Sequence, residues 1–297
     1  MIMTRLRWNS KTAFLFAAIG SAVGLGNIWR FPYLAYEYGG GAFLIPYLLA
    51  LLVLGMPLLI MEFGLGQKMQ KGAADSMKAI NPKLKGVGVA AVAGAFVITV
   101  YYAVVMAWAL IYFVQSFGTK LPWAADAEGH FFNSVLQLSP GIETLGGINV
   151  PVLIALAVVW LLIFLSVKDG VKSVGKVVMV TMPLPIVLLV LLFFRGITLP
   201  GALSGIMAYI TPDFTALLDP SIWAAAAGQI FFTLSLGFGV MIAYASFNKK
   251  NETVSNNALI TAASNSAISL FAGFVVFSII GYMATATGVS IADVAVA

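Results

Sequence analysis

Residues 20–32 read GSAVGLGNIWRFP, and this stretch decides how the rest of the chain is interpreted. It lies inside an apolar run from Phe14 to Tyr36 that is long enough to cross a membrane as a helix. A glycine costs about 1 kcal/mol relative to alanine in a helix interior, and this run carries Gly20, Gly24 and Gly26. Interrupted backbone at membrane depth, tolerated only beside protein or a wet cavity, offers carbonyl oxygens to cations and amides to anions. The stretch therefore predicts half of a binding site for a small ion and a small zwitterion, with the Asn27 side chain beside it.

A second apolar segment, from Ile222 to Phe247, is interrupted in the same way. Its residues 228–239 read GQIFFTLSLGFG, with the hydroxyls of Thr233 and Ser235 between the glycines. Two glycine-broken segments in corresponding halves of a chain are the sequence pointer to a transporter site at the membrane midplane. Glycines of this kind can instead allow close helix packing, with no binding site. The hydroxyl and amide side chains beside them favour the binding site.

The composition is that of a polytopic membrane protein in contact with the lipid bilayer. Of the 297 residues, 61% are hydrophobic and 9% are charged, whereas soluble domains carry about 25% charged residues. The absence of cysteine excludes disulfides, thiol catalysis and cysteine-ligated metals. The net charge of +5 implies no nucleic-acid partner. We find no nucleophile–base arrangement, phosphate loop or metal cluster in the sequence, so an enzyme is not predicted.

Seven apolar segments are long enough to span a membrane: 12–36, 41–66, 87–117, 150–167, 176–196, 222–247 and 254–285. Thirteen of the sixteen basic residues lie in the N-terminus and in three alternate loops, and acidic residues dominate the opposite loops. By the positive-inside rule, the N-terminus is cytoplasmic in a multi-pass protein of the cell (inner) membrane.

If the first and sixth segments begin two equivalent halves, one half occupies about 205–210 residues and a complete pair needs about 410. We therefore expect residues 1–205 to form a first repeat and residues 206–297 to begin a second one. On this interpretation the chain is a single transporter domain that ends after its seventh helix.

Several polar side chains lie within the predicted spans. Asn257, Thr261, Asn265 and Ser269 recur every four residues and share one helix face. Such residues can simply hydrogen-bond helices together, but Asn265 and Ser269 reach mid-membrane depth. The carboxyl of Glu62 is expected to hold amides freed by a broken neighbouring helix, rather than to carry protons.

The motifs resemble one known family. GSAVGLGNIWRFPYLAYEYGGGAFLIPY (20–47), GMPLLIMEFGLG (55–66), VYY (100–102), TPDF (211–214) and GQIFFTLSLGFG (228–239) are similar to the neurotransmitter:sodium symporter family, and most of all to its bacterial LeuT-type amino-acid transporters. The resemblance implies an all-α membrane protein with a five-plus-five inverted repeat, in which helices 1 and 6 are broken mid-membrane. It also implies sodium-driven uptake by alternating access.

The resemblance assigns the following roles. The substrate pocket would be formed by Ala22, Gly24, Leu25, Gly26, Ile98, Tyr102, Phe232, Thr233, Ser235 and Phe238. A first sodium site would use Ala22, Asn27, Thr233 and Asn265 together with the substrate carboxylate. A second would use carbonyls of Gly20 and Val23, with further ligands on an eighth helix. Arg30 would belong to an outer gate, and Arg5 with Trp8 to an inner gate, although these three could be ordinary interfacial anchors.

Two details refine the expected ligands. Monoamine members of the family carry an aspartate where this chain has Gly24, so an amino acid is favoured over a biogenic amine. Ser269 stands where chloride-independent bacterial members can have an acid, which predicts a chloride ion near Tyr47, Gln229, Thr233, Asn265 and Ser269. The chloride would compensate the charge of two sodium ions and a neutral zwitterion.

We therefore expect a sodium-coupled symporter of neutral, hydrophobic amino acids, with chloride assisting. Phe232 and Phe238 would supply an apolar pocket, and Ile98 and Ser235 would set its size. Two alternatives stay open. The chain could bind amino acids as a sensor or channel without coupled transport, or it could be a fragment without a complete site.

Overall fold

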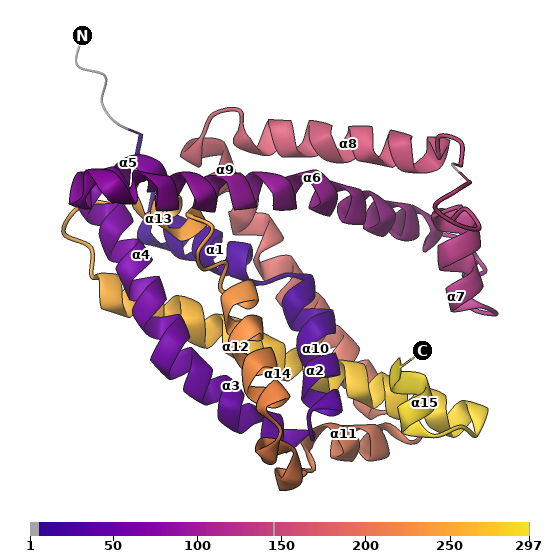
Figure 1. The fold of residues 1–297 in the computed structure, drawn as a ribbon. Coiled ribbons are helices and arrows are strands. Elements are labelled where there is room, and N and C mark those ends of the chain that lie inside the picture. Colours follow the sequence, from indigo (N-terminus) through magenta and orange to yellow (C-terminus); the bar gives the residue numbers. More distant parts are fainter. Residues whose placement is uncertain (1–5, 145, 297) are drawn as a thin grey trace. The chain divides into compact units, whose positions relative to one another are not determined.

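A computed structural model describes residues 6–144 and 146–296 of the chain. In these residues the regular structure is helical, apart from an isolated β-bridge between Gly40 and Pro212 (Figure 1). The chain separates into two compact units, Met1–Val92 with Val174–Ala297, and Ala93–Ser173. Each unit is described by itself. The expected all-α membrane architecture is confirmed.

The first membrane segment is broken, as predicted. Helix α1 (Lys11–Ala22) begins at Ser10, whose side chain accepts from the Ala13 amide, and it ends at the first break. A π-helical turn η1 (Gly26–Arg30) and helix α2 (Phe31–Glu37) follow, bent by 54° from α1. The elements η2 (Gly41–Phe43), α3 (Leu44–Ala50), η3 (Leu51–Gly55) and α4 (Met56–Met69) then run on as one span.

The rest of the first unit contains the second break. After α5 (Ala73–Ile80) and η4 (Pro82–Leu84), the chain enters α6 (Lys85–Gln115) and leaves the unit. It returns through α9 (Val171–Thr181), α10 (Pro183–Ile197), α11 (Ala202–Ile210) and η6 (Phe214–Leu218). Helices α12 (Pro220–Thr233) and α13 (Val240–Ala245) are separated by the non-helical residues 234–239, and α14 (Val254–Thr287) and α15 (Ile291–Val296) follow.

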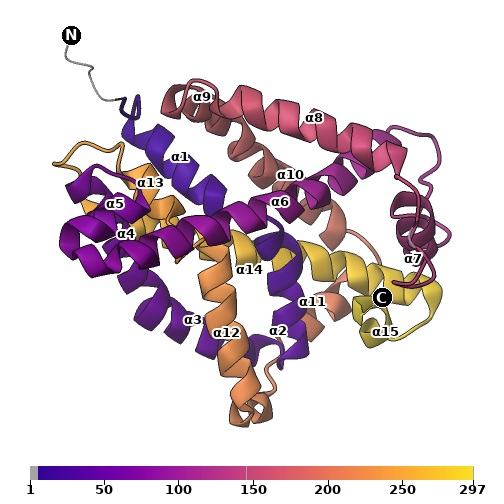
Figure 2. The same ribbon diagram turned by 45° about the horizontal axis from the view of Figure 1, so that its top comes forward.

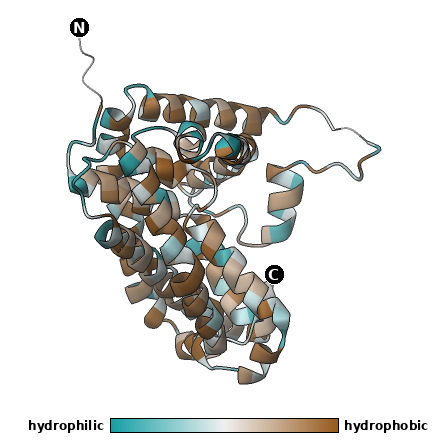
Figure 3. Ribbon diagram, turned by 60° about the vertical axis from the view of Figure 1, so that its left-hand side comes forward, coloured by the Kyte–Doolittle hydropathy of each residue, from teal (hydrophilic) through white to brown (hydrophobic). Residues whose placement is uncertain are grey.

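Five helices or helix runs of the described chain are long and apolar enough to cross a membrane, or six when the bent pair is counted as one span. The hydropathy colouring shows apolar residues along most of their length (Figure 3). Of the seven predicted segments, 222–247 is missing from this count. The reason is physical: its unwound middle leaves two short helices, α12 and α13, in place of one long one.

Helix α14 forms the centre of the first unit. It contacts α1, α2, α4, α10 and α11, and both views show it between α4 and α11 (Figures 1 and 2). The polar face of this helix is buried. Its four residues are each at most 1% exposed: Asn257, Thr261, Asn265 and Ser269. Because these polar groups lie in a protein interior rather than in lipid, they must find partners within the unit.

The outer ends of two segments meet at the β-bridge. The amide of Asp213 donates to the Gly39 carbonyl over 2.9 Å, and the amide of Gly41 donates to the Thr211 carbonyl over 3.4 Å. Gly39 and Gly40 have positive φ angles of 87° and 61°, which only glycine adopts without strain. The bridge ties the end of α2 to the segment that leads into α12.

The second unit holds the rest of α6, with α7 (Ala127–Gly129), η5 (His130–Val135) and α8 (Val150–Val167). Ala103 and Ala107 of α6 pack against Ala155 and Val159 of α8. The loop between them is ordered by Asn149, which begins α8 and donates to the carbonyls of Val135 and Leu136.

Candidate functional site

The two breaks lie side by side in the first unit. The hydroxyl of Ser235, in the second break, donates to the Ser21 carbonyl at the end of α1 over 3.0 Å. Gly237 and Gly239 have φ angles of 81° and 73°, so the second break needs glycine for its conformation. The adjacent breaks bring opened backbone from sequence-distant helices into one region, as a midplane site requires.

A buried cluster of amides and hydroxyls adjoins the breaks. Asn27 accepts from the Gly24 amide over 2.9 Å, and its Nδ2 donates to Asn265 Oδ1 over 2.8 Å and to Ser269 Oγ over 2.7 Å. The hydroxyl of Thr233 also donates to Asn265 Oδ1, over 3.1 Å. All of these side chains are at most 1% exposed. The structure therefore brings together Asn27, Thr233 and Asn265, the predicted side-chain ligands of the first sodium site.

The chemistry of this cluster suits a hard monovalent cation. Neutral amide and hydroxyl oxygens, with the carbonyls of an opened helix, are oxygen donors of the kind that such cations take. Each carboxamide presents an oxygen on one side and an NH2 group on the other. Rotation of Asn27 about its side chain would therefore turn an oxygen toward Asn265 without moving the backbone.

The amide nitrogen of Asn265 and the hydroxyl of Tyr47 are hydrogen-bond donors in the same part of the unit. Asn265 Nδ2 is buried and has no hydrogen-bond partner in the structure. Nearby on the same helix, Ser266 accepts from the hydroxyl of Tyr47 over 3.0 Å, and Tyr47 is fully buried. A buried, unpartnered N–H calls for an acceptor, because leaving it bare costs about 1–3 kcal/mol. An anion here would be that acceptor.

Glu62 holds the second break, as predicted. Its Oε1 accepts from the amide of Gly237 over 2.7 Å, and the residue is 4% exposed. The bond satisfies a backbone donor that an intact helix would have paired internally. The other carboxyl oxygen, Oε2, is buried without a hydrogen-bond partner in the structure.

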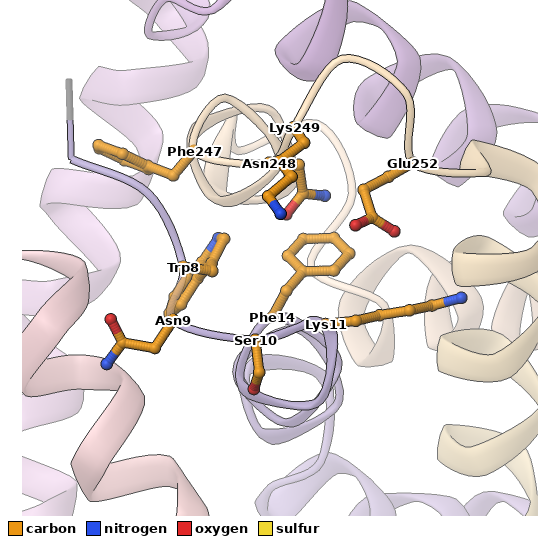
Figure 4. Close-up of a pocket in the computed structure, with 9 residues that line it drawn as sticks. All are labelled: Trp8, Asn9, Ser10, Lys11, Phe14, Phe247, Asn248, Lys249 and Glu252. Atoms are coloured by element: carbon orange, nitrogen blue, oxygen red, sulfur yellow. The ribbon is translucent and has the colours of Figure 1, made fainter. Parts of the chain in front are cut away.

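The N-terminal segment of the first unit is held by contacts with main-chain carbonyls. Trp8 Nε1 donates to the Tyr244 carbonyl over 2.8 Å, and Arg7 Nη1 donates to the Asn248 carbonyl over 3.3 Å. A cavity of about 60 Å³ lies beside them, between the N-terminal segment and the loop after α13. Figure 4 shows residues that line it, Lys11 and Glu252 among them. Of the two residues predicted for an inner gate, Trp8 makes these contacts and its role as a gate stays a prediction, whereas Arg5 lies outside the described residues.

Sequence reasoning missed the amides that hold this loop. Gln67 Nε2 donates to the carbonyls of Lys250 and Glu252, over 3.1 and 2.7 Å, and Gln70 Nε2 donates to the Asn248 carbonyl over 2.9 Å. Both glutamines are buried at the end of α4. Two glutamines in an apolar, basic helix end were the signal that could have revealed them.

The remaining predicted residues fall into three groups. Ala22, Gly24, Leu25 and Gly26 lie at the first break. Phe232 lies in the last turn of α12 before the second break, and Phe238 lies within that break. Gly20 and Val23 line a second cavity of about 270 Å³ with Met182, Pro185 and Tyr244 among others. Ile98 and Tyr102 belong to the second unit, so their place in the pocket stays a prediction.

Comparison with known proteins gives a consistent family match. A model described as the sodium:neurotransmitter symporter family matches residues 5–128 and 125–297. The chain is 42% identical over 288 residues to an uncharacterized sodium-dependent transporter of Methanocaldococcus jannaschii, covering 97% of this chain and 58% of the relative. It is 41% identical over 303 residues to the human sodium- and chloride-dependent transporter XTRP3, covering 96% and 51%.

A third relative is the human sodium- and chloride-dependent creatine transporter 1, which is 41% identical over 330 residues, covering 98% of this chain and 52% of the relative. The chain therefore spans about half the length of the curated relatives it matches.

Proposed function

Since the chain belongs to the sodium:neurotransmitter symporter family, we propose that it takes part in the sodium-coupled uptake of a neutral amino acid by alternating access. Members of this family are transporters, which confirms the prediction that the chain is not an enzyme. The apolar helices and the family make it a multi-pass membrane protein. The observation that carries the proposal is the buried cluster of Asn27, Thr233 and Asn265 beside two adjacent helix breaks.

Sodium would bind within this cluster. Side-chain oxygens of Asn27, Thr233 and Asn265 would act with the Ala22 carbonyl and the substrate carboxylate. We assign a second ion to the carbonyls of Gly20 and Val23, which border the larger cavity. The names of the relatives, which describe sodium-dependent transporters, support sodium as the coupled ion.

The substrate would lie between the breaks. The N-terminal ends of the helical segments after each break would meet its carboxylate, because such ends carry partial positive charge. Gly24 supplies no carboxylate, so the substrate would bring its own. Phe232 and Phe238, with Ile98, Tyr102 and Ser235, would enclose a hydrophobic side chain. Leu25 and Gly26 would approach through their backbone.

Chloride would bind against Asn265 Nδ2, together with Tyr47, Gln229, Thr233 and Ser269. The unpartnered buried amide donor supports this site. The described cluster around Asn265 carries amide and hydroxyl groups without a formal charge, so an anion would offset the sodium charge. Two relatives are named as sodium- and chloride-dependent transporters.

The remaining assignments complete the proposal. Residues 1–205 would form the first inverted repeat and 206–297 the start of the second. The N-terminus would be cytoplasmic, in the cell (inner) membrane. Arg30 would form part of the outer gate, and Trp8 with Arg5 part of the inner one. The contacts of Trp8 with α13 and of Arg7 with the loop after α13 support closure at the inner end.

The test is binding of radiolabelled neutral amino acids to the natural gene product in lipid nanodiscs. Sodium is exchanged for potassium or choline while chloride is held constant. Binding that requires sodium supports the shared ion–substrate site. Sodium-independent binding would favour a sensor or channel. Accumulation in potassium-loaded proteoliposomes diluted into a sodium medium then separates coupled transport from binding alone.

A further inference from the structure

Exposed lysines gather where two membrane spans of the first unit end. The apolar runs Gly41–Met69 and Pro82–Gln115 are joined by α5, so this connection lies at a boundary between membrane and water. Asp75 is the one acidic residue between positions 68 and 85. Five lysines lie in the same stretch, each of them exposed: Lys68, Lys71, Lys78, Lys83 and Lys85. Within residues 6–144 and 146–296, none of these lysines has an ion-pair partner.

Helix α5 is amphipathic, and its apolar side is covered only in part. Ala73 is buried, and a Cβ added to Gly239 at the start of α13 would come within 2.7 Å of the Ala73 Cβ. Helix α5 therefore packs closely on α13 at this point. Beyond the contact the apolar side chains are uncovered, since Ile80 is 55% exposed and Leu84, in η4, is 37% exposed. Lysines beside uncovered apolar side chains are the pattern of a segment that lies in the membrane interface.

The lysine ammonium groups suit the phosphate group of an anionic lipid. A lysine pairs with phosphate as a point charge, and its apolar stem can lie along the membrane while the ammonium stays at headgroup level. Each basic residue at such a surface strengthens binding to anionic lipid by about fivefold. Free phosphate would gain this charge attraction but would leave Ile80 and Leu84 in water, so the two features together favour a lipid.

We propose that residues 68–85, here called the basic interface segment, bind the headgroups of anionic phospholipids. Lys78, Lys83 and Lys85 hold the phosphate groups, and the neighbouring apolar side chains enter the outermost part of the acyl chains. The proposal concerns the lipid alone. It depends neither on the substrate nor on the coupled ion, so it can hold or fail independently of the proposed function.

Bound lipid also restrains the second break. Because Ala73 packs on Gly239, where the left-handed turn of the break ends and α13 begins, a headgroup that holds α5 in place limits the movement of α13. The basic interface segment thus connects the lipid composition of the membrane to the backbone of the broken helix.

The first test measures lipid selectivity at the segment. The chain has no cysteine, so Ala79→Cys, at an exposed position, carries a fluorophore in the natural gene product, with any cysteine beyond this chain replaced by serine. Quenching by dibrominated phosphatidylglycerol is compared with quenching by dibrominated phosphatidylcholine in nanodiscs. We expect the phosphatidylglycerol to bind about fivefold more tightly or better. Raising potassium chloride from about 0.1 M to about 1 M should reduce this preference, because salt screens the charges.

Two triple variants locate the effect. Replacing Lys78, Lys83 and Lys85 together by glutamine should bring the preference close to one, while quenching by phosphatidylcholine stays unchanged and shows that the segment still lies at the membrane. The matched control replaces three exposed lysines of another basic stretch by glutamine and should keep the preference of the parent: Lys168, Lys172 and Lys176.

Three results would overturn the proposal. One is a parent protein without preference for phosphatidylglycerol, and another is an equal loss of preference in both triple variants. The third is removal of the preference by inorganic phosphate added at constant ionic strength, which would show a site for the free anion rather than for a lipid.

The second test examines the restraint on α13. Hydrogen exchange of residues 237–245 is followed in nanodiscs of phosphatidylcholine alone and of equal parts phosphatidylcholine and phosphatidylglycerol. We expect exchange to be about threefold slower with phosphatidylglycerol in the parent and in the control variant, because local opening becomes rarer. The variant without Lys78, Lys83 and Lys85 should exchange equally in both lipids. Equal exchange in the parent would overturn the connection between the lipid and the second break.

Discussion

The hydroxyl of Ser235 donates to the carbonyl oxygen of Ser21 over 3.0 Å, across 214 positions of sequence. Ser235 has a positive φ angle of 53°, an uncommon conformation for a residue with a side chain. Strain of this kind clusters at functional sites and costs about 1–3 kcal/mol per residue. The bond satisfies a carbonyl freed where α1 ends. A side chain of the second break thus replaces a backbone hydrogen bond that is lost at the first.

The two glycines Gly228 and Gly237 allow a direct test of this backbone. A Cβ added at either position would meet no atom within 4 Å, so only conformation distinguishes them. Gly237→Ala should lower the free energy of unfolding by about 1–2 kcal/mol, because its φ is 81°. Gly228→Ala, inside α12, should raise it by up to about 1 kcal/mol. Denaturant unfolding in detergent measures both, and equal shifts would contradict the left-handed break.

Substitutions of Glu62 separate a brace from a proton carrier. Glu62→Leu leaves the Gly237 amide without its acceptor, and we expect a loss of about 1–3 kcal/mol in the free energy of unfolding. Glu62→Gln keeps an acceptor oxygen of the same reach and should retain most of the stability and the sodium-dependent binding. If Glu62→Gln behaved like Glu62→Leu, the titratable proton rather than the hydrogen bond would be the essential feature.

Asn265 and Asn257 form a matched pair on one face of α14. Both are buried, at 0% and 1% exposed, but only Asn265 contacts Asn27 and Thr233. Asn265→Ala should raise the sodium concentration for half-maximal substrate binding by about tenfold or more, since an ion loses a ligand. Asn257→Ala should reduce thermal stability with little change in the sodium titration. A similar sodium shift in both variants would argue against a localised ion site.

Ser269→Glu tests the chloride assignment. A carboxylate at this position would supply the compensating charge, so sodium-dependent binding should no longer change when chloride is replaced by gluconate. Ser269→Ala is the control, because it removes a hydroxyl without adding charge. Its sodium-dependent binding should still require chloride, but the difference between chloride and gluconate should be smaller. A parent protein that is indifferent to gluconate would rule the chloride site out from the start.

Much of the site could be predicted because lipid restricts what a helix can contain. Glycines and amides inside an apolar run are costly there. Their positions therefore identified both breaks, and with them Asn27 and Asn265. The same cost singled out the buried carboxyl of Glu62, whereas the grouping of Asn27 with Asn265 in one site came from the family resemblance. The same reasoning predicted the segment 222–247 as one span interrupted by its glycines, and the structure divides it into α12 and α13.

Other contacts show only one partner in the sequence, because the second partner is a main-chain group that every residue carries. The carbonyls of Lys250 and Glu252 accept from Gln67 regardless of which side chains those positions bear. The hydrogen bonds of Gln229 with Arg30 and Gly26 depend on the rotation of α12 about its axis relative to η1. The spacing of residues along one helix does not determine that rotation. The π-helical turns η1 and η3 were missed for a related reason, since they change the register within otherwise ordinary apolar sequence.

The bridge at Gly40 and Pro212 has a mechanical consequence. The segment that follows the first break and the segment that precedes the second are joined at two places. One is the bridge between Gly40 and Pro212, and the other is the hydrogen bond from Gln229 to the Gly26 carbonyl. Because these two segments are joined at both places, one of them cannot tilt without the other. The surface at residues 211–219 is therefore linked to the buried cluster, and we expect an antibody fragment bound there to restrict movement at the proposed sodium site.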